Sequence, residues 1–515
     1  MYDYVIVGAG SAGAVLATRL SEDPDVRVCL VEAGGRDTAE DIHVPVGFGR
    51  LFRTDFDWDH DTHAEPHLRR RRVYLGHGRV LGGSSATNNM IYVRGNRLDF
   101  DGWGQPGWSY ADLLPCFLRA EDNERGESEF HATGGPLRVS DGRSKNPMSA
   151  AFVEAATQAG YKRTEDFNGA EQDGFGEFQV TQRDGRREST ATAYLHPAAA
   201  RPNLTVETDL RVHRVLVEAG RAVGVTGGRH GEEVTVRAER EVIVSAGAYN
   251  SPHLLQLSGI GPAALLGALG VPVVADLPAV GANLQDHALI PLVYTHEHPI
   301  SLLAAGTPEN VARYMESASG PLTSNGPEAG GFIRTRSTLT APDVEFLAAP
   351  VMFADGGLGS PTGHAVTFGP SMLTPLSRGT VSLASPQPTA KPKIVHNYFA
   401  EPEDLAAAVD ALRIALEIAD QTALAPYTTT PHTVPASESD ADLRAHIRAY
   451  AHSTYHPAGT CAIGTVVDPQ LRVHGIDGLR VADASVMPTG VRGNPNAAVI
   501  AIAERAAELI RETAR

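Results

Sequence analysis

The sequence predicts an α/β fold in which a parallel-sheet unit is combined with a second unit built on an antiparallel sheet with helices. In residues 1–35 an apolar run is followed by glycines at G-x-G-x-x-G spacing, a helix-compatible segment and a second apolar run. This order of strand, tight turn, helix and strand is typical of a Rossmann-like, dinucleotide-binding unit. Residues 290–450 are rich in Pro, Thr and Ser, and their short strand-like runs precede a helical stretch at 403–419. This second pattern favours the antiparallel unit.

The glycine turn has the residue types that a bound pyrophosphate requires. Gly8 permits the tight turn, Gly10 lets the backbone approach the phosphates, and Gly13 lets the helix pack on the strand. Ser11 and Ala12 stand at the N-terminus of the expected helix, where free N–H groups and the positive end of the helix dipole face the ligand. A flexible turn without a ligand is the alternative, and the flanking strands argue against it.

The second apolar run ends at Glu32, where a carboxylate can accept hydrogen bonds from ribose hydroxyls. Ala33 and the two glycines after it form a further turn of close backbone approach. No second glycine motif is preceded by a strand, because the residues before Gly259 have helical spacing. A separate nicotinamide-binding unit is therefore not expected.

Length and charge limit the possible partners. A chain of 515 residues is too long for one core, so at least two domains are expected. The 44 basic and 61 acidic residues give a net charge of −17. This balance argues against a nucleic-acid or anionic-membrane partner, since both require positive charge on the protein.

Cysteine usage and hydropathy indicate a cytoplasmic location. The three cysteines are too far apart for a disulfide framework or a C-x-x-C site. The first expected strand begins by Tyr4, which leaves no room for a signal peptide. No apolar run approaches the ~20 residues of a membrane span.

Residues 78–95 form a second stretch rich in glycine and other small residues, and they lead to two consecutive amides. The Gly-Gly-Ser-Ser turn around Gly83, preceded by Val80, brings bare backbone close to a ligand. Asn88 and Met90 follow on the same segment. A plain tight turn is the alternative, and by spacing alone the stretch indicates a second cofactor contact.

Two further regions have strand patterns. Residues 203–217 alternate as strand, and residues 233–247 are interpreted as a hairpin strand pair that ends in a buried run containing Ala246. A short helix is expected at 253–257. Strand-like runs of the second unit are expected at 343–347, 364–368 and 379–383.

The C-terminal region holds the expected chemistry. Tyr455 and His456 precede Pro and Gly, and a histidine of near-neutral pKa is a natural acceptor for a hydroxyl proton. A strand at 479–482 ends at Asp483, and the final helix is expected from about residue 495 to 511. His60 and His63, among carboxylates, suggest a metal site, but an exposed polar loop or edge strand is the favoured interpretation, so no metal is expected.

Taken together, these motifs resemble the glucose–methanol–choline (GMC) oxidoreductases, specifically their bacterial alcohol and choline dehydrogenase branch. The resemblance covers essentially the whole chain. It rests on five ordered motifs, at 8–13 with Glu32, 78–95, 247–261, 280–287 and 456–460.

The resemblance implies an FAD-dependent enzyme with His456 as the catalytic histidine and Asn494 at the second active-site position. Tyr455 is a candidate substrate contact. The candidate cofactor contacts are Gly8, Gly10, Ser11, Ala12, Gly13, Glu32, Ala33, Val80, Gly83, Asn88, Met90, Val212, Ala246, Asp483, Ala484, Pro495 and Asn496.

The expected reaction oxidises an alcohol to the aldehyde by hydride transfer to flavin N5. The alcohol is expected to be primary, whether benzylic, furanic, aliphatic or choline-like, and the electron acceptor is O2 or another oxidant. His456 takes the hydroxyl proton, so the rate should fall at low pH with an apparent pKa near that of histidine. Asn494 donates a hydrogen bond to the developing alkoxide. It is also expected to cap the last helix, in which Pro495 is the first residue.

Three positions depart from the family pattern. Thr87 occupies the place of a histidine to which some members link FAD covalently, so FAD is expected to be non-covalent. Ile463 replaces the usual Met, and the loop at 464–468 is short. The family also contains hydroxynitrile lyases, so a lyase and a non-catalytic flavoprotein are the alternatives.

The motif-bearing pieces come from both ends and the middle of the chain. The sequence therefore predicts a discontinuous FAD-binding domain and a substrate domain made from the remaining segments. The FAD-binding segments are 1–145, 195–290 and 451–515, and the substrate segments are 146–194 and 291–450.

Overall fold

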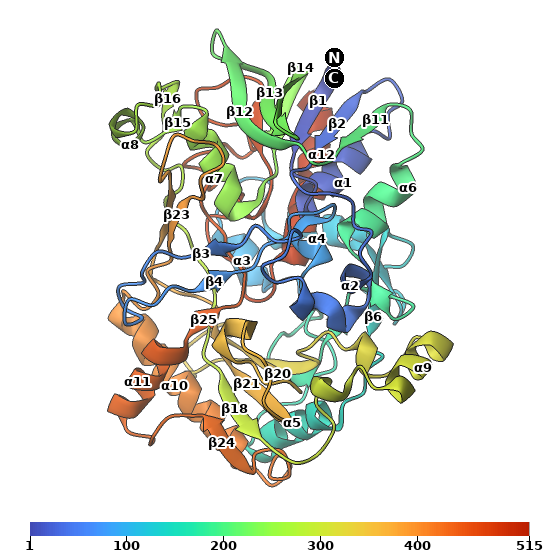
Figure 1. Cartoon of the computed structure of the whole chain (residues 1–515), viewed down its shortest axis with the longest axis vertical. Helices are drawn as coiled ribbons and strands as arrows, with labels where there is room; N and C mark the ends of the chain where they lie inside the picture. The colour runs from blue at the N-terminus through green and yellow to red at the C-terminus, as the bar shows by residue number, and fades with distance from the viewer. Residues whose placement is uncertain (514–515) are drawn as a thin grey trace.

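A computed structural model describes residues 1–513 and contains two large sheets, which Figure 1 shows in the upper and lower halves of the molecule. The first sheet has the order β11-β2-β1-β14-β13-β12, with β26 beside β14. Its strands β11, β2, β1, β14 and β26 pair in parallel, and β12 and β13 extend it by antiparallel pairing. The strand bounds are β1 Tyr2–Val7, β2 Val28–Val31, β11 Leu204–Glu207, β12 Arg211–Glu218, β13 Arg221–Arg229, β14 Glu232–Val244 and β26 Leu479–Val481.

Helices from opposite ends of the chain pack together beside this sheet. Helix α1 (Ser11–Leu20) contacts α12 (Asn496–Thr513), which also contacts α4 (Tyr110–Ala120). The buried Glu504 carboxylate accepts hydrogen bonds from Arg19 Nε at 2.9 Å and from Tyr194 Oη at 3.0 Å. Figure 1 shows both chain termini at the same end of the molecule. The parallel sheet is therefore assembled from segments that lie far apart in the sequence.

The second sheet is antiparallel, with the order β24-β18-β21-β20-β19-β7, and β17 joins it between β21 and β25. Helices α5 (Pro147–Gln158) and α10 (Pro402–Ala419) pack against it. The strand bounds are β7 Gly174–Glu177, β17 Ala288–Leu289, β18 Leu292–Thr295, β19 Ala329–Ile333, β20 Val344–Ala349, β21 Ala365–Met372, β24 Thr430–Thr433 and β25 His452–Ser453.

Shorter elements connect the two sheets. They are α2 Glu40–His43, β3 His60–Asp61, β4 Tyr74–Leu75, α3 Arg97–Gly102, β5 Glu121–Asn123, β6 Leu137–Asp141, β8 Gln179–Val180, β9 Gln182–Arg183, β10 Arg186–Arg187, α6 His196–Ala198, α7 Gly247–Leu257, β15 Ile260–Gly261, α8 Ala263–Ala268, β16 Ala275–Asp276, α9 Pro308–Ser317, β22 Thr380–Ser382, β23 Lys393–Val395 and α11 Asp440–Tyr450. Within residues 1–513, no helix combines the length and apolar character needed to cross a bilayer.

Three expected elements differ in the structure. The hairpin expected at 233–247 is wrong, because β14 is one continuous strand whose first part pairs with β13 and whose last part pairs with β1 and β26. The helix expected at 253–257 begins earlier, as α7, and contains Pro252 at its middle. The run at 379–383 forms β22, which pairs with β23 and stays outside the antiparallel sheet.

Each large sheet has its own apolar cluster. One cluster includes the parallel strands with α1 and α12, and the other includes β20, β21 and α10. We propose that these clusters are the cores of the two discontinuous domains predicted from the sequence. Neither cluster is built from one continuous stretch of chain, which supports the discontinuity, whereas Leu68, Val73 and Leu75 of segment 1–145 belong to the second cluster.

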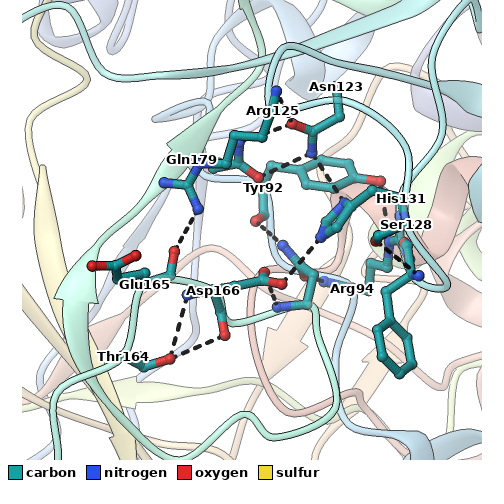
Figure 2. Close-up of polar contacts among 12 residues, drawn as sticks. Tyr92, Arg94, Asn123, Arg125, Ser128, His131, Thr164, Glu165, Asp166 and Gln179 are labelled. Atoms are coloured by element: carbon teal, nitrogen blue, oxygen red, sulfur yellow. Dashed lines mark hydrogen bonds and ion pairs between the residues drawn. The ribbon is translucent and has the colours of Figure 1, made fainter.

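A buried ionic network anchors the segment that carries Asn88 and Met90. Arg94 Nη2 donates to Glu121 Oε2 at 2.8 Å, and both side chains are fully buried. The ring of His131 lies between two carboxylates, with Nδ1 3.0 Å from Glu121 Oε1 and Nε2 3.1 Å from Asp166 Oδ2. Figure 2 shows Asp166 and Asn123 on opposite sides of this ring. The network therefore ties the segment at residue 94 to β5 and to the loops that carry His131 and Asp166.

The His131 network should make stability depend on pH in the alkaline range. Burial lowers the pKa of His131, but its bonds to Asp166 and Glu121 outweigh burial and raise the pKa to about 9. A raised histidine pKa contributes stability that is complete below the unfolded-state value and is lost as pH rises through the folded-state value. We expect the melting temperature to fall as pH rises from about 6.5 to about 9, and we expect His131→Gln to flatten this fall. His432→Gln, at an exposed site, is the control, and equal slopes in all three proteins would contradict the prediction.

Candidate active site

A cavity of about 860 Å³ lies between the two sheets. Its wall contains the glycine turns of the first sheet, the segment at 87–91, strands β20 and β21, and the C-terminal residues from 453 to 457. The volume is within the range of cofactor and ligand sites. The cavity is therefore large enough for an extended ligand that reaches from the parallel sheet to the antiparallel one.

Bare backbone forms one end of this cavity. A Cβ on Gly83, whose φ is +52°, would lie 2.6 Å from the Cα of Gly10, so the two glycine turns touch without side chains between them. Ser11 Oγ donates to Asn496 Oδ1 at 2.7 Å, which brings the N-termini of α1 and α12 side by side. Two helix N-termini next to exposed N–H groups form a site suited to a pyrophosphate. This end of the cavity fits a dinucleotide.

Glu32 supports the same end. Its Oε2 accepts from the N–H of Ala9 at 2.9 Å, and its Oε1 accepts from the N–H of Gly34 at 2.8 Å. Burial raises the pKa of Glu32, and these backbone bonds oppose that rise. The carboxylate therefore connects both turns by hydrogen bonds, a role that sequence reasoning did not assign. Its remaining lone pairs stay available to a ribose.

Glu32→Ala should reduce both flavin retention and thermal stability. The substitution leaves two buried N–H groups unpaired, at a cost of about 1–3 kcal/mol each. The flavin-to-protein ratio after gel filtration and the melting temperature test this expectation. Glu40→Ala, which removes an exposed carboxylate paired with Arg186, is the matched control. Normal flavin content in Glu32→Ala would show that the carboxylate does not support this site.

His456 lies at the other end of the cavity, between two partners. Its Nδ1 is 3.0 Å from Nδ1 of His287, and its Nε2 is 3.2 Å from Nδ2 of Asn494. Burial, together with His287 and His77, lowers the pKa of His456 well below its ordinary value. The ring is therefore neutral at pH 7, and the apparent pKa near that of free histidine expected from the sequence is wrong.

Asp286 fixes the backbone at this histidine. One carboxylate oxygen accepts from the N–H of His456 at 2.8 Å, and the other accepts from Ser453 Oγ at 2.6 Å and from the hydroxyl of Tyr398. Burial raises the pKa of Asp286 to about 6, and burial lowers that of the adjacent His287 to about 4. Sequence reasoning assigned no role to Asp286 or His287, although both residues lie in the family motif at 280–287.

Asn494 precedes the last helix without capping it. The carbonyl of Pro495 accepts from the N–H of Val499 at 2.9 Å, so Pro495 is the residue at the helix boundary and α12 begins at Asn496. The expected cap at Asn494 and first helical position at Pro495 are therefore wrong by one residue. Within residues 1–513, Oδ1 of Asn494 is buried without a hydrogen-bond partner. An unpaired buried acceptor in a cavity wall is suited to a ligand that can donate a hydrogen bond.

Most of the predicted site residues line this one cavity. Gly13 does not, because it packs against Gly8, and Val80 does not, because it lies in a small apolar cluster. Sequence reasoning missed the apolar residues of the wall, which lie on segments without a motif. The predicted residues that line the cavity are Gly8, Gly10, Ser11, Ala12, Glu32, Ala33, Gly83, Asn88, Met90, Val212, Ala246, Tyr455, His456, Asp483, Ala484, Asn494, Pro495 and Asn496.

Comparison with known families identifies the chain. The N-terminal GMC oxidoreductase family model matches residues 2–289, and the C-terminal model matches residues 375–503. The chain belongs to the GMC oxidoreductase family. The FAD cofactor and the oxidation of an alcohol, which the sequence motifs predicted, are thereby confirmed.

Similar GMC proteins can be aligned with almost the whole chain. An oxygen-dependent choline dehydrogenase from Pseudomonas aeruginosa (strain LESB58) is 43% identical over 99% of this chain and 94% of its own length. The crystal structure of pyridoxine 4-oxidase from Mesorbium loti is 33% identical with a TM-score of 0.90, covering 99% of both chains. A fungal aryl-alcohol oxidase is 25% identical with a TM-score of 0.86, covering 100% of this chain and 99% of its own.

Proposed function

We propose that this chain oxidises a primary alcohol to the aldehyde, with His456 as the base and with FAD held non-covalently. The observation that carries the proposal is the neutral imidazole of His456, which lies against the Asn494 amide in the wall of a cavity suited to a dinucleotide. A neutral histidine accepts a proton from a hydroxyl, whereas a protonated one cannot.

The residues present fit FAD. The turns at Gly10 and Gly83, with the N-termini of α1 and α12, would hold the pyrophosphate, and Glu32 would hold the adenosine ribose. The strand at Val212 would face the adenine. Bound FAD supplies the acceptor for the hydride that leaves the alcohol carbon. Thr87, in the cavity wall, offers no imidazole for a covalent link, which supports non-covalent binding.

The hydrogen bonds of His456 define which ring nitrogen is basic. The Asn494 Nδ2–H group donates to Nε2, so Nε2 carries the lone pair and Nδ1 carries the hydrogen that is donated to His287. When the Asn494 amide turns from Nε2 to the alcohol oxygen, the lone pair of Nε2 becomes free to accept the hydroxyl proton, and His287 holds the ring in this tautomer. The Asn494 amide, next to Nε2, is placed to donate a hydrogen bond to the alcohol oxygen as negative charge develops there.

Anaerobic mixing of the purified yellow protein with a panel of primary alcohols tests the proposal. We expect the flavin absorbance band to bleach, and we expect acid precipitation to release the flavin into the supernatant. A hydroxynitrile lyase or a non-catalytic flavoprotein would leave the band unchanged with every alcohol. Subsequent addition of oxygen separates an oxidase, in which the band returns quickly, from a dehydrogenase that uses another acceptor.

We also propose a cytoplasmic location. The three cysteines, Cys29, Cys116 and Cys461, are buried and free, as is usual in a reducing compartment. Fractionation of the source cells, with the flavin-dependent activity as the marker, tests this location.

A further inference from the structure

An aromatic wall borders the part of the cavity that contains His456. The ring of Phe52 lies 6.1 Å from that of Tyr455 and 6.5 Å from that of Phe48, measured between centroids. A Cβ on Gly357 would lie 3.0 Å from Phe52 and 3.1 Å from Phe353, so the loop at 357 closes over these rings. All five residues line the cavity. The space in front of the base is therefore bordered by rings that pack against one another.

The antiparallel sheet contributes aliphatic side chains to the same space. Leu347 and Ala349 on β20 line the cavity, whereas the alternate residues Phe346 and Ala348 belong to the apolar core behind the sheet. Leu289 on β17, two residues after His287, also lines the cavity. The surface that a substrate body meets on this side is therefore apolar.

The carboxylates of the cavity wall are already bonded within the protein. Among the described lining residues these are Glu32, Asp57 and Asp483. Asp57 accepts from the N–H groups of residues 53 and 77 at 2.9 Å and from a tyrosine hydroxyl. Asp483 accepts from the N–H of residues 247 and 485 at 2.9 and 2.8 Å. All three carboxylates are therefore held by hydrogen bonds within the protein, and Asp57 bonds Tyr74, whose ring packs against the aromatic wall at Phe52.

Glu345 is a buried carboxyl group on strand β20 of the second sheet. It lies two residues before Leu347 on β20, is 0% exposed, and within residues 1–513 neither of its oxygens has a hydrogen-bond partner. Burial raises its pKa to about 8, so the group is neutral at pH 7. It is absent from the cavity wall. Glu345 therefore supplies no negative charge to a substrate.

The aromatic wall is poorly suited to a second cation. The guanidinium of Arg53 already lies 4.6 Å from the ring centroid of Tyr74, and that ring is 5.5 Å from Phe52. Arg53 is itself paired with Asp59 and Asp61 outside the cavity wall, and a cation–π contact alone compensates only part of the cost of removing an ammonium group from water. A quaternary ammonium would lose its hydration here, and the carboxylates of the described wall are already stabilised by hydrogen bonds within the protein.

We infer that the substrate of this site is an uncharged primary alcohol with an apolar body, and that alcohols carrying a quaternary ammonium group are rejected. The inference rests on the proposed function and narrows its substrate class. It separates this chain from the choline dehydrogenases that it resembles.

Choline and 3,3-dimethylbutan-1-ol are a matched pair of probes, because they have nearly the same shape and differ in charge. We expect the second-order rate constant for anaerobic flavin reduction to be at least about 100-fold higher with the uncharged alcohol than with choline. The reason is that a poorly compensated buried charge costs several kcal/mol. Benzyl alcohol should also reduce the flavin. Choline equal to or better than its isostere would overturn the inference and leave the proposed function standing. Failure of every alcohol would overturn the proposed function and this inference with it.

A pair of variants gives a second test. Leu347→Glu places a carboxylate in the apolar wall, and Leu347→Gln changes size and polarity in the same way without the charge. We expect the preference for the isostere over choline to fall at least tenfold in Leu347→Glu relative to Leu347→Gln, with flavin content measured in both. The same preference in both variants would show that charge at this wall does not control selection, and would overturn the inference.

Discussion

Replacing His456 by Gln should lower the rate of flavin reduction by an alcohol by roughly 10²–10⁴-fold, the loss typical of removing a general base. Glutamine has a similar size and can still form hydrogen bonds, but its amide does not accept the hydroxyl proton. FAD binding should survive, because the two glycine turns and Glu32 lie at the other end of the cavity. Rapid-mixing absorbance without oxygen measures the rate. His474→Gln, at an exposed site, is the matched control, and a near-normal rate in His456→Gln would rule out the base.

The pH dependence of the same rate tests the environment of His456. Its pKa is lowered by burial and by His287 and His77, so the neutral, proton-accepting form persists at pH values where a free histidine is protonated. We expect the rate to stay constant as pH falls through about 6.5 and to decline only below it. A midpoint at or above the ordinary histidine value would contradict this environment.

Gly13→Ala should give a protein that contains no FAD and melts at a lower temperature. A Cβ at this position would lie 1.8 Å from the carbonyl oxygen of Gly8 and 3.0 Å from its carbonyl carbon. Because both atoms belong to the backbone of the nucleotide turn, the clash is relieved only by moving α1 away from β1. Such a shift disturbs the buried core, and the whole stability of a domain is only about 5–15 kcal/mol.

The control for this substitution is Gly267→Ala. Gly267 lies in α8, where a Cβ meets no atom within 4 Å, and Ala is favoured over Gly inside a helix by about 0.5–1 kcal/mol. The control should bind FAD normally and melt at the same temperature or slightly higher. Flavin content and melting temperature measure both effects. A Gly13→Ala protein with a full complement of FAD would show that the turn tolerates a side chain.

The nucleotide end of the cavity was predictable from sequence, because its geometry follows from local rules. The order of β1, the glycine turn, α1 and β2 follows from residue spacing, and Gly8, with φ +98°, and Gly13, whose Cβ would clash with Gly8, are required by backbone geometry at the turn. Glu32 follows directly from the end of β2. The family motifs extended this prediction to His456 and Asn494, which the structure places 3.2 Å apart at the far end of the cavity.

The substrate wall was not predictable, since no local signal marks it. Phe52, Leu347 and Phe353 lie on segments with ordinary composition, and only the packing of β20 and two loops brings them to the cavity. The pKa of His456 was predicted wrongly for the same reason, because its desolvation comes from residues far away in sequence. The single long strand β14 was also missed, since its two halves pair with different neighbours.

The position of β1 in the middle of its sheet has a consequence for biosynthesis. This strand is synthesised before β14, so one of its edges stays unpaired until then, and the outer edge of β14 stays unpaired until β26 is synthesised. Helix α12, which brings Asn496 to Ser11, is synthesised after all of these strands. Long-range pairing of this kind is slow and leaves apolar strand edges open to aggregation during synthesis. The strand edges of the nascent chain therefore stay exposed until β26 is made, and the end of the cavity that is suited to the cofactor is completed only when α12 follows.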